Sequence, residues 1–167
     1  GVSKMPNKQS QAFTLLELLV CLTILTFLAL SSQSLHALAQ GQHLKDATLN
    51  IYSLIQLSRA HALSHNTRVT LCSLTLTGDC SSKWASTLSV FADPNGNRKL
   101  DANELHIRMI DLPDGLELSW RGMGSGNNLH FNSQGQTFVT NGTFKLSLGE
   151  QTRQVTLNRQ GKPRIGI

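Results

Sequence analysis

Apolar residues follow two different periodicities, and the change between them divides the chain into a helical part and a strand-rich part. Residues 13–30 form an almost unbroken apolar stretch that contains one acid, Glu17. Apolar positions then recur at intervals of three and four residues up to about Asn66, which is typical of an amphipathic helix. The pattern therefore predicts one helix over residues 13–66. Gly41 is its expected weak point, because an interior glycine costs up to about 1 kcal/mol relative to alanine.

From Thr67 onward the period changes to two, in short runs bounded by Gly, Asn, Asp and Pro. Such runs are typical of antiparallel strands joined by turns. A long amphipathic helix followed by strands favours an α+β fold, in which the sheet buries the apolar stripe of the helix. The expected strands cover residues 68–74, 87–91, 105–110, 116–120, 129–132, 143–148 and 153–158.

The apolar stretch 13–30 is long enough to cross a lipid bilayer. At 1.5 Å per residue it spans about 27 Å, close to the roughly 30 Å hydrocarbon core. The preceding segment is polar and carries Lys4 and Lys8 but no acid, so we expect the N-terminus to stay in the cytoplasm. A carboxylate inside a bilayer costs about 2.5 to 3.5 kcal/mol, which makes Glu17 a candidate functional residue. The alternative is an interfacial residue at the membrane edge.

The residues around this acid carry a family resemblance. The octet AFTLLELL, residues 12–19, resembles the cleavage and methylation site of type IV prepilins and type II secretion pseudopilins. The resemblance implies that a prepilin peptidase cuts between Ala12 and Phe13 and that the new N-terminal Phe13 is N-methylated. It also implies that Glu17 pairs with the N-terminal amine during assembly. Ala12 stands where Gly is commoner, which predicts slower processing.

The same resemblance implies a division of the chain into three parts. Residues 1–12 are the leader, residues 13–40 the hydrophobic half of the helix that anchors the subunit, and residues 41–167 a globular domain outside the cytoplasm. The subunit would sit in the inner membrane, crossing it once, before it enters an extracellular pilus or a periplasmic pseudopilus. Its partners would be other major and minor pilins and the prepilin peptidase. Met5 is a more natural translation start than Gly1, which leaves the leader length open.

Three later segments narrow the resemblance to the GspH/FimT branch of minor pilins and pseudopilins. They read FADPNGNRKLD, LHFNSQG and RQVTLNRQGKPR, over residues 91–101, 129–135 and 153–164. The resemblance implies a type IV pilin-like fold, with a long N-terminal helix packed on an antiparallel sheet domain. In FimT-like proteins, a tail of Gly, Arg or Lys, any residue and Arg is implicated in DNA binding during natural transformation. The matching positions here are 161–164.

Positive charge is concentrated at the C-terminal end. The chain has 15 Lys and Arg against 10 Asp and Glu, and the segment 145–167 carries five cations and one acid. Gly161 and Pro163 keep its last part out of a regular helix or a central strand. We therefore expect an exposed tail whose cations can reach a polyanion, and the FimT resemblance implies that this polyanion is extracellular double-stranded DNA, bound through its phosphates without sequence preference. The residues expected to take part are Lys162, Arg164, Arg159, Arg153 and Gly161.

Two alternatives remain open for this tail. It could be a solvated end of the last strand, or a surface that docks on neighbouring pilins. In either case the chain would be a structural minor subunit that primes pilus assembly, or a pseudopilin of a type II secretion filament, and it would not bind DNA.

Two of the three cysteines are candidates for a disulfide. Cys72 and Cys80 flank a polar turn in a part of the chain expected outside the cytoplasm, so we predict a disulfide between them. Cys21 lies in the apolar helix and is expected to pack as a small hydrophobe. His61 and His65 have a helical spacing that can hold zinc, but no third ligand is identifiable, so we expect surface residues.

The segment 93–104, DPNGNRKLDANE, comes close to an EF-hand calcium loop, with side-chain oxygens at positions 1, 3, 5, 9 and 12. The sixth position, which needs Gly for the sharp turn, is Arg98, and Lys99 adds a second cation. We therefore expect a polar hairpin connection without a metal, and a calcium-stabilised pseudopilin is a third alternative. The sequence shows no catalytic triad, defensible carboxylate pair or phosphate-binding glycine loop, so we expect neither catalysis nor a cofactor.

Overall fold

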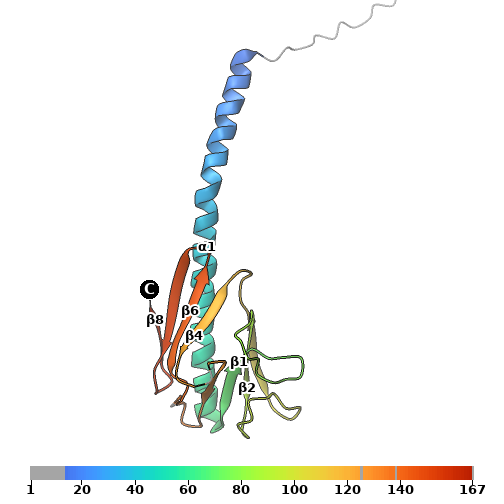
Figure 1. Ribbon diagram of the computed structural model, residues 1–167, viewed down its shortest axis with the longest axis vertical. Helices are drawn as coiled ribbons and strands as arrows, with labels where there is room; N and C mark the ends of the chain where they lie inside the picture. Colours follow the sequence, from blue (N-terminus) through green and yellow to red (C-terminus); the bar gives the residue numbers. More distant parts are fainter. Residues whose placement is uncertain (1–13, 125, 138, 167) are drawn as a thin grey trace, which may run out of the picture. The chain divides into compact units, whose positions relative to one another are not determined.

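The computed structural model describes residues 14–166 except residues 125 and 138, and for residues 31–37 it describes the helical backbone alone. The described chain consists of one long helix, α1 (Leu15–His65), followed by eight strands (Figure 1). The expected α+β fold is confirmed. The strands are β1 (Val69–Cys72), β2 (Thr87–Ala92), β3 (His106–Asp111), β4 (Glu117–Gly122), β5 (Asn128–Phe131), β6 (Gly142–Leu148), β7 (Gln151–Leu157) and β8 (Pro163–Gly166).

Helix α1 has the bounds that its periodicity predicts to within two residues. Its N-terminus is capped by Thr14, whose Oγ1 accepts a hydrogen bond from the Glu17 N–H at 3.3 Å. Glu17 itself lies in the first turn, where a negative charge is favourable. The helix continues through Gly41 without a break, and it ends before Asn66, which takes a left-handed conformation with a φ of 48°.

The chain forms two compact units, residues 1–38 and residues 39–167. In the first unit every described side chain from residue 14 to residue 30 is exposed, including the large apolar ones and the unpaired Cys21. The expected packing of Cys21 as a small hydrophobe therefore stays a prediction. Among the described residues, no helix has the length and apolarity that a membrane crossing requires. The leader 1–12, the cleavage site at Ala12 and the first residue of the expected span, Phe13, lie outside the described residues.

The core of the second unit forms where the C-terminal half of α1 meets the strands (Figure 1). Leu44, Ile51 and Ile55 are at most 1% exposed and lie on one helical stripe. Phe131 and Phe144 come from different sheets and belong to the same buried cluster. The predicted burial of the helix stripe against strands is therefore confirmed.

The strands form two four-stranded sheets, in the orders β3-β2-β1-β5 and β4-β6-β7-β8. Every strand pairing in them is antiparallel. The seven strands expected from the sequence correspond to β1 to β7. The division into two sheets is not visible in the local pattern of any strand, because it depends on which strands pair.

The segment expected to be an exposed tail contains a regular edge strand, β8. Pro163 is its first residue and lies opposite Leu157 of β7. Since β8 is the edge strand of its sheet, a residue without an N–H group is tolerated there. The argument from Gly161 and Pro163 excluded a central strand but not an edge strand.

The predicted disulfide between Cys72 and Cys80 is present. It closes a loop that contacts the segment 93–104, which connects β2 to β3 as the expected hairpin. The Cys80 N–H donates to the Arg98 carbonyl at 3.1 Å, and the Leu100 N–H donates to the Gly78 carbonyl at 2.8 Å. These bonds join the two loops at one end of the first sheet.

Candidate functional site

A tight turn over residues 158–162 positions the C-terminal cations. The Asn158 side-chain oxygen accepts the Lys162 N–H at 2.9 Å, and the Asn158 carbonyl accepts the Gly161 N–H at 3.0 Å. The turn is also fixed to its surroundings, because the Arg59 Nε of α1 donates to the Gln160 carbonyl at 3.2 Å. The segment expected to be an exposed tail therefore consists of a turn fixed by hydrogen bonds, followed by an edge strand.

Gly161 is required by the backbone of this turn. Its φ is 73°, a left-handed value that L side chains rarely adopt. It is buried, and a Cβ atom there would clash with the Gly135 carbonyl oxygen and approach the Phe131 ring to 3.1 Å. The conformation of Gly161 sets where Lys162 and Arg164 lie.

The register of the second sheet decides which cations share a face. On β7, Val155 and Leu157 are buried, so the residues that alternate with them point outward. Arg164 of β8 lies opposite Thr156, which places it on this outer face. The hydroxyls of Thr143 and Thr156 are 3.1 Å apart, which agrees with the same register across β6 and β7.

Two further cations share this outer face. Lys145 of β6 lies opposite Gln154, and Arg121 of β4 lies opposite Thr143. Both are exposed, and together they line a shallow depression with neighbouring polar residues. Serine and threonine hydroxyls fill much of the remaining face. We call this surface the outer face, defined by Arg121, Lys145, Arg164, Ser119, Thr143, Thr152, Gln154 and Thr156.

Sequence reasoning missed Lys145 and Arg121 as candidate site residues. Lys145 was one of the C-terminal cations, and the alternation of β6 around the buried Phe144 and Leu146 places it on the polar side. Arg121 precedes the C-terminal charge cluster in the sequence, and only the pairing of β4 with β6 brings it close.

The predicted DNA-binding residues do not all gather at one place. Arg153 is half-buried and alternates in phase with Val155 and Leu157, so it lies on the opposite side of the sheet from Arg164. Lys162 is exposed and lines a groove with Tyr52 and Arg59 of α1. Arg159 is exposed in the turn.

The outer-face cations have no acidic partner among the described residues. In the part of the chain that the structure describes, Arg121, Lys145 and Arg164 form no ion pair, whereas Lys99 and Asp79 do so at 3.7 Å. One acid, Glu117 of β4, lies on the same side, opposite Ser147. The outer face therefore presents three unpaired cations and one acid among neutral polar groups, and this net positive charge suits the binding of phosphate groups.

The histidine pair on α1 offers no comparable site. The rings of His61 and His65 stack with their centroids 4.0 Å apart. Burial lowers the pKa of His61, and the charge of His65 lowers it further. Among the described residues, no three His, Cys, Asp or Glu side chains are arranged to hold a metal ion.

In a comparison with known proteins, the sequence matches two family models and the fold is similar to several solved structures. Residues 47–161 match the model described as type II transport protein GspH, and residues 7–32 match that of the prokaryotic N-terminal methylation motif. The sequence matches no curated protein.

Two solved structures illustrate the fold likeness. The type IV minor pilin FimU of Pseudomonas aeruginosa is similar with a TM-score of 0.57 and 16% sequence identity, over 75% of this chain and 90% of FimU. The minor pseudopilin EpsH from the type 2 secretion system of Vibrio cholerae has a TM-score of 0.51 and 16% identity, over 73% of this chain and 94% of EpsH. At these identities the likeness shows the fold alone.

A substitution at Gly161 tests the account of the turn. We expect Gly161→Ala to lower the free energy of unfolding by about 1 to 2 kcal/mol from the left-handed conformation, with a further loss from the clash with Gly135. Denaturation of the full chain in detergent micelles, followed by the fluorescence of Trp84 and Trp120, measures this loss. Gly166→Ala is the matched control, because a Cβ there meets no atom closer than the Gln154 Cβ at 3.8 Å. Equal stability of the two variants would contradict this role of Gly161.

Proposed function

The chain belongs to the GspH family of type II transport proteins, and from that premise we propose that it is a minor pilin whose outer face binds double-stranded DNA. The family and the N-terminal methylation motif imply a subunit that is anchored in a membrane and then joins a pilus or pseudopilus. Its proposed role is structural and binding rather than catalytic. Its proposed partners are other pilins, the prepilin peptidase and DNA.

The proposed assembly route follows from the first unit. Prepilin peptidase cuts between Ala12 and Phe13, and the new N-terminal amine is methylated. The apolar residues from Leu15 to Leu30, exposed all round the helix, hold the subunit in the inner membrane with its N-terminus in the cytoplasm. On entry into the filament, these side chains pack against neighbouring subunits, and Glu17 pairs with an N-terminal amine.

The observation that carries the DNA proposal is the unpaired cationic outer face. Adjacent strands lie about 4.8 Å apart, so Arg121 on β4 and Arg164 on β8 are separated by three strand spacings, about 14 Å. Lys145 lies on β6 between them. Duplex DNA carries one negative charge for about every 1.7 Å of its axis, so a duplex laid across this face meets several cations at once.

The proposed contacts are to phosphates and therefore carry no sequence information. Lys162 and Arg159 precede the first residue of β8 and extend the positive charge toward the groove beside α1. Gly161 acts through the turn, and Arg153 contributes least because of its opposite orientation. A few such contacts give weak binding, which many subunits in one filament strengthen through avidity.

A second candidate function rests on the family description and on the EpsH likeness. In it, the chain is a pseudopilin of a type II secretion filament, or it primes pilus assembly, and its β8 edge contacts a neighbouring subunit. The main-chain groups on the free side of β8 suit strand pairing with such a neighbour. This candidate requires no affinity for DNA.

DNA binding across a salt series separates the two candidates. We expect the full chain in detergent micelles to bind a fluorescent duplex with a log-log salt slope of about −2 to −4. The double variant Lys145→Gln/Arg164→Gln should weaken binding and reduce the magnitude of that slope by about 2, because each lost phosphate contact removes about 1. Fluorescence anisotropy at several salt concentrations measures both effects, and Lys162→Gln reports the contribution of the turn.

The control is Lys83→Gln/Arg108→Gln, which removes two exposed cations outside the second sheet. It should retain the wild-type slope. If the wild type does not bind, or if both double variants lose the same affinity, the outer face is not a DNA site and the second candidate function is preferred.

The proposed processing has its own test. Mass spectrometry and N-terminal sequencing of membrane-extracted protein should find an N-methylated Phe13. Ala12→Gly should increase the processed fraction, because it restores the residue that prepilin peptidases meet most often. Protein that retains its leader in both forms would contradict cleavage at Ala12.

A further inference from the structure

Two carboxylate oxygens in the connection between β2 and β3 are buried without a donor. They are Oδ1 of Asp93 and Oε1 of Glu104, neither of which has a hydrogen-bond partner among the described residues. Asp93 is 0% exposed. Its other oxygen, Oδ2, accepts hydrogen bonds from the Thr70 hydroxyl at 2.7 Å and the Arg98 N–H at 3.3 Å. Because burying a charged oxygen without a partner is costly, a bound cation is the natural complement.

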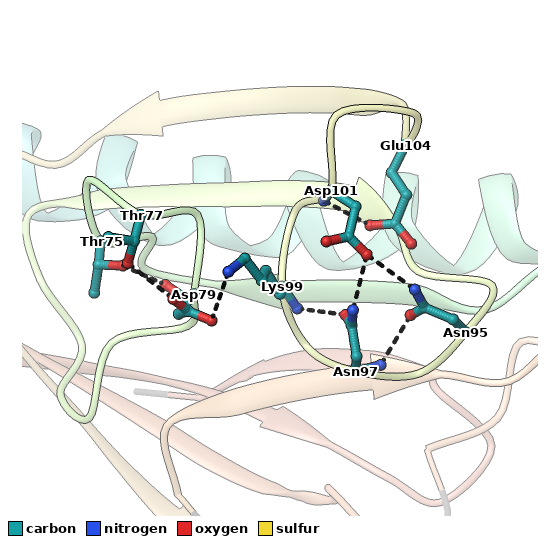
Figure 2. Close-up of polar contacts among 8 residues, drawn as sticks. All are labelled: Thr75, Thr77, Asp79, Asn95, Asn97, Lys99, Asp101 and Glu104. Carbon is teal, nitrogen blue, oxygen red and sulfur yellow. Dashed lines mark hydrogen bonds and ion pairs between the residues drawn. The ribbon is translucent and has the colours of Figure 1, made fainter.

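Four further oxygen-bearing side chains of this loop, those of Asn95, Asn97, Asp101 and Glu104, lie close together (Figure 2). The side-chain amides of Asn95 and Asn97 both donate to Oδ2 of Asp101, at 2.9 and 2.8 Å. Oε2 of Glu104 accepts the Asp101 N–H at 3.1 Å. With Asp93, these residues occupy positions 1, 3, 5, 9 and 12 of the segment 93–104. An EF-hand loop takes its calcium ligands from the same positions.

The structure answers the objection about the sharp turn and pairs one of the two cations, while Arg98 keeps its charge beside the loop. Arg98, at the sixth position, takes a left-handed conformation with a φ of 62°, so the sharp turn forms without a glycine. The Lys99 ammonium lies 3.7 Å from Oδ1 of Asp79 in the disulfide loop (Figure 2). Its charge is therefore paired with that neighbouring carboxylate.

The ligand chemistry points to a hard cation. No three His, Cys, Asp or Glu side chains of the described residues converge on one point, so a complete ligand set needs amide and main-chain oxygens. Calcium accepts such oxygens, in numbers of six to eight and in flexible geometry, whereas zinc prefers sulfur and imidazole. We propose that the segment 93–104 binds one calcium ion through Asp93 and Glu104, completed by main-chain oxygens and by the amide oxygens of Asn95 and Asn97, whose amide groups Asp101 holds in place.

The electrostatics of the loop agree with this proposal. Burial raises the pKa of Glu104, and the nearby charges of Asp93 and Asp101 raise it further, against the lowering effect of the Asp101 N–H. A divalent cation near these carboxylates would offset their mutual repulsion.

Calcium at this site would stabilise two loops together. The segment 93–104 bonds to the disulfide loop through Cys80, Gly78 and Asp79, so ordering one loop orders the other. This role is independent of the DNA proposal, because the site lies in the first sheet's connections and the outer face belongs to the second sheet.

Equilibrium dialysis with radioactive calcium tests the site in the full chain, held in detergent micelles and first treated with a chelator. We expect about one calcium per chain with a dissociation constant of about 10⁻⁴ to 10⁻³ M, the range of extracellular modules. The thermal midpoint should rise with added calcium chloride. Glu104→Gln should weaken binding about tenfold or more and remove the rise, because it removes one of the two buried carboxylate ligands.

Glu117→Gln is the matched control, since it makes the same change at an exposed acid of β4. It should bind calcium as the wild type does. Asp101→Asn is a second loop variant, and it should also bind calcium more weakly than the wild type. The proposal is overturned if the wild type takes up no calcium, if Glu104→Gln binds as tightly as the wild type, or if magnesium chloride produces an equal thermal shift.

Discussion

The burial of one apolar stripe on the C-terminal half of α1 is the constraint on which the second unit depends. Leu44, Ile51 and Ile55 lose almost all contact with water, and the cluster that covers them contains residues of both sheets. The apolar stripe of a helix and the apolar inner face of a sheet are each unfavourable when exposed to water. Their association buries both surfaces. Once the inner face of the second sheet is committed to this core, its alternate residues must face outward. The core therefore determines the cationic outer face.

The two sheets have different proposed roles: the connections of the first stabilise the domain, and the outer face of the second binds DNA. The first sheet carries the disulfide and the proposed calcium loop, residues 93–104, at its connections. The second sheet carries Arg121, Lys145 and Arg164 on a face free of internal acidic partners among the described residues. Its edge is held in place by the turn at Gly161 and by the hydrogen bond from Arg59 to Gln160, so the cations are presented by a fixed backbone.

Sequence reasoning succeeded where the signal is local. The 3.6-residue period located α1, the alternation located β1 to β7, and the cysteine spacing together with the expected compartment predicted the disulfide. It failed where the answer depends on pairing between distant strands. Which strands share a sheet, and hence that Lys145 and Arg121 join Arg164 while Arg153 faces away, is contained in no single segment. The edge strand β8 was missed because Pro163 excludes only central positions, and the left-handed Arg98 was missed because glycine is the usual residue there.

Site-specific cross-linking tests the central claim, that the outer face is the surface that meets DNA. A photoreactive amino acid is placed at Thr156, on the outer face beside Arg164, or at Met109, which is exposed on β3 of the first sheet. Each full-length protein is irradiated with duplex DNA in detergent micelles. The account predicts a cross-link from position 156 that disappears at high salt, and little or none from position 109. Equal cross-linking from both positions, or cross-linking from position 109 alone, would contradict it.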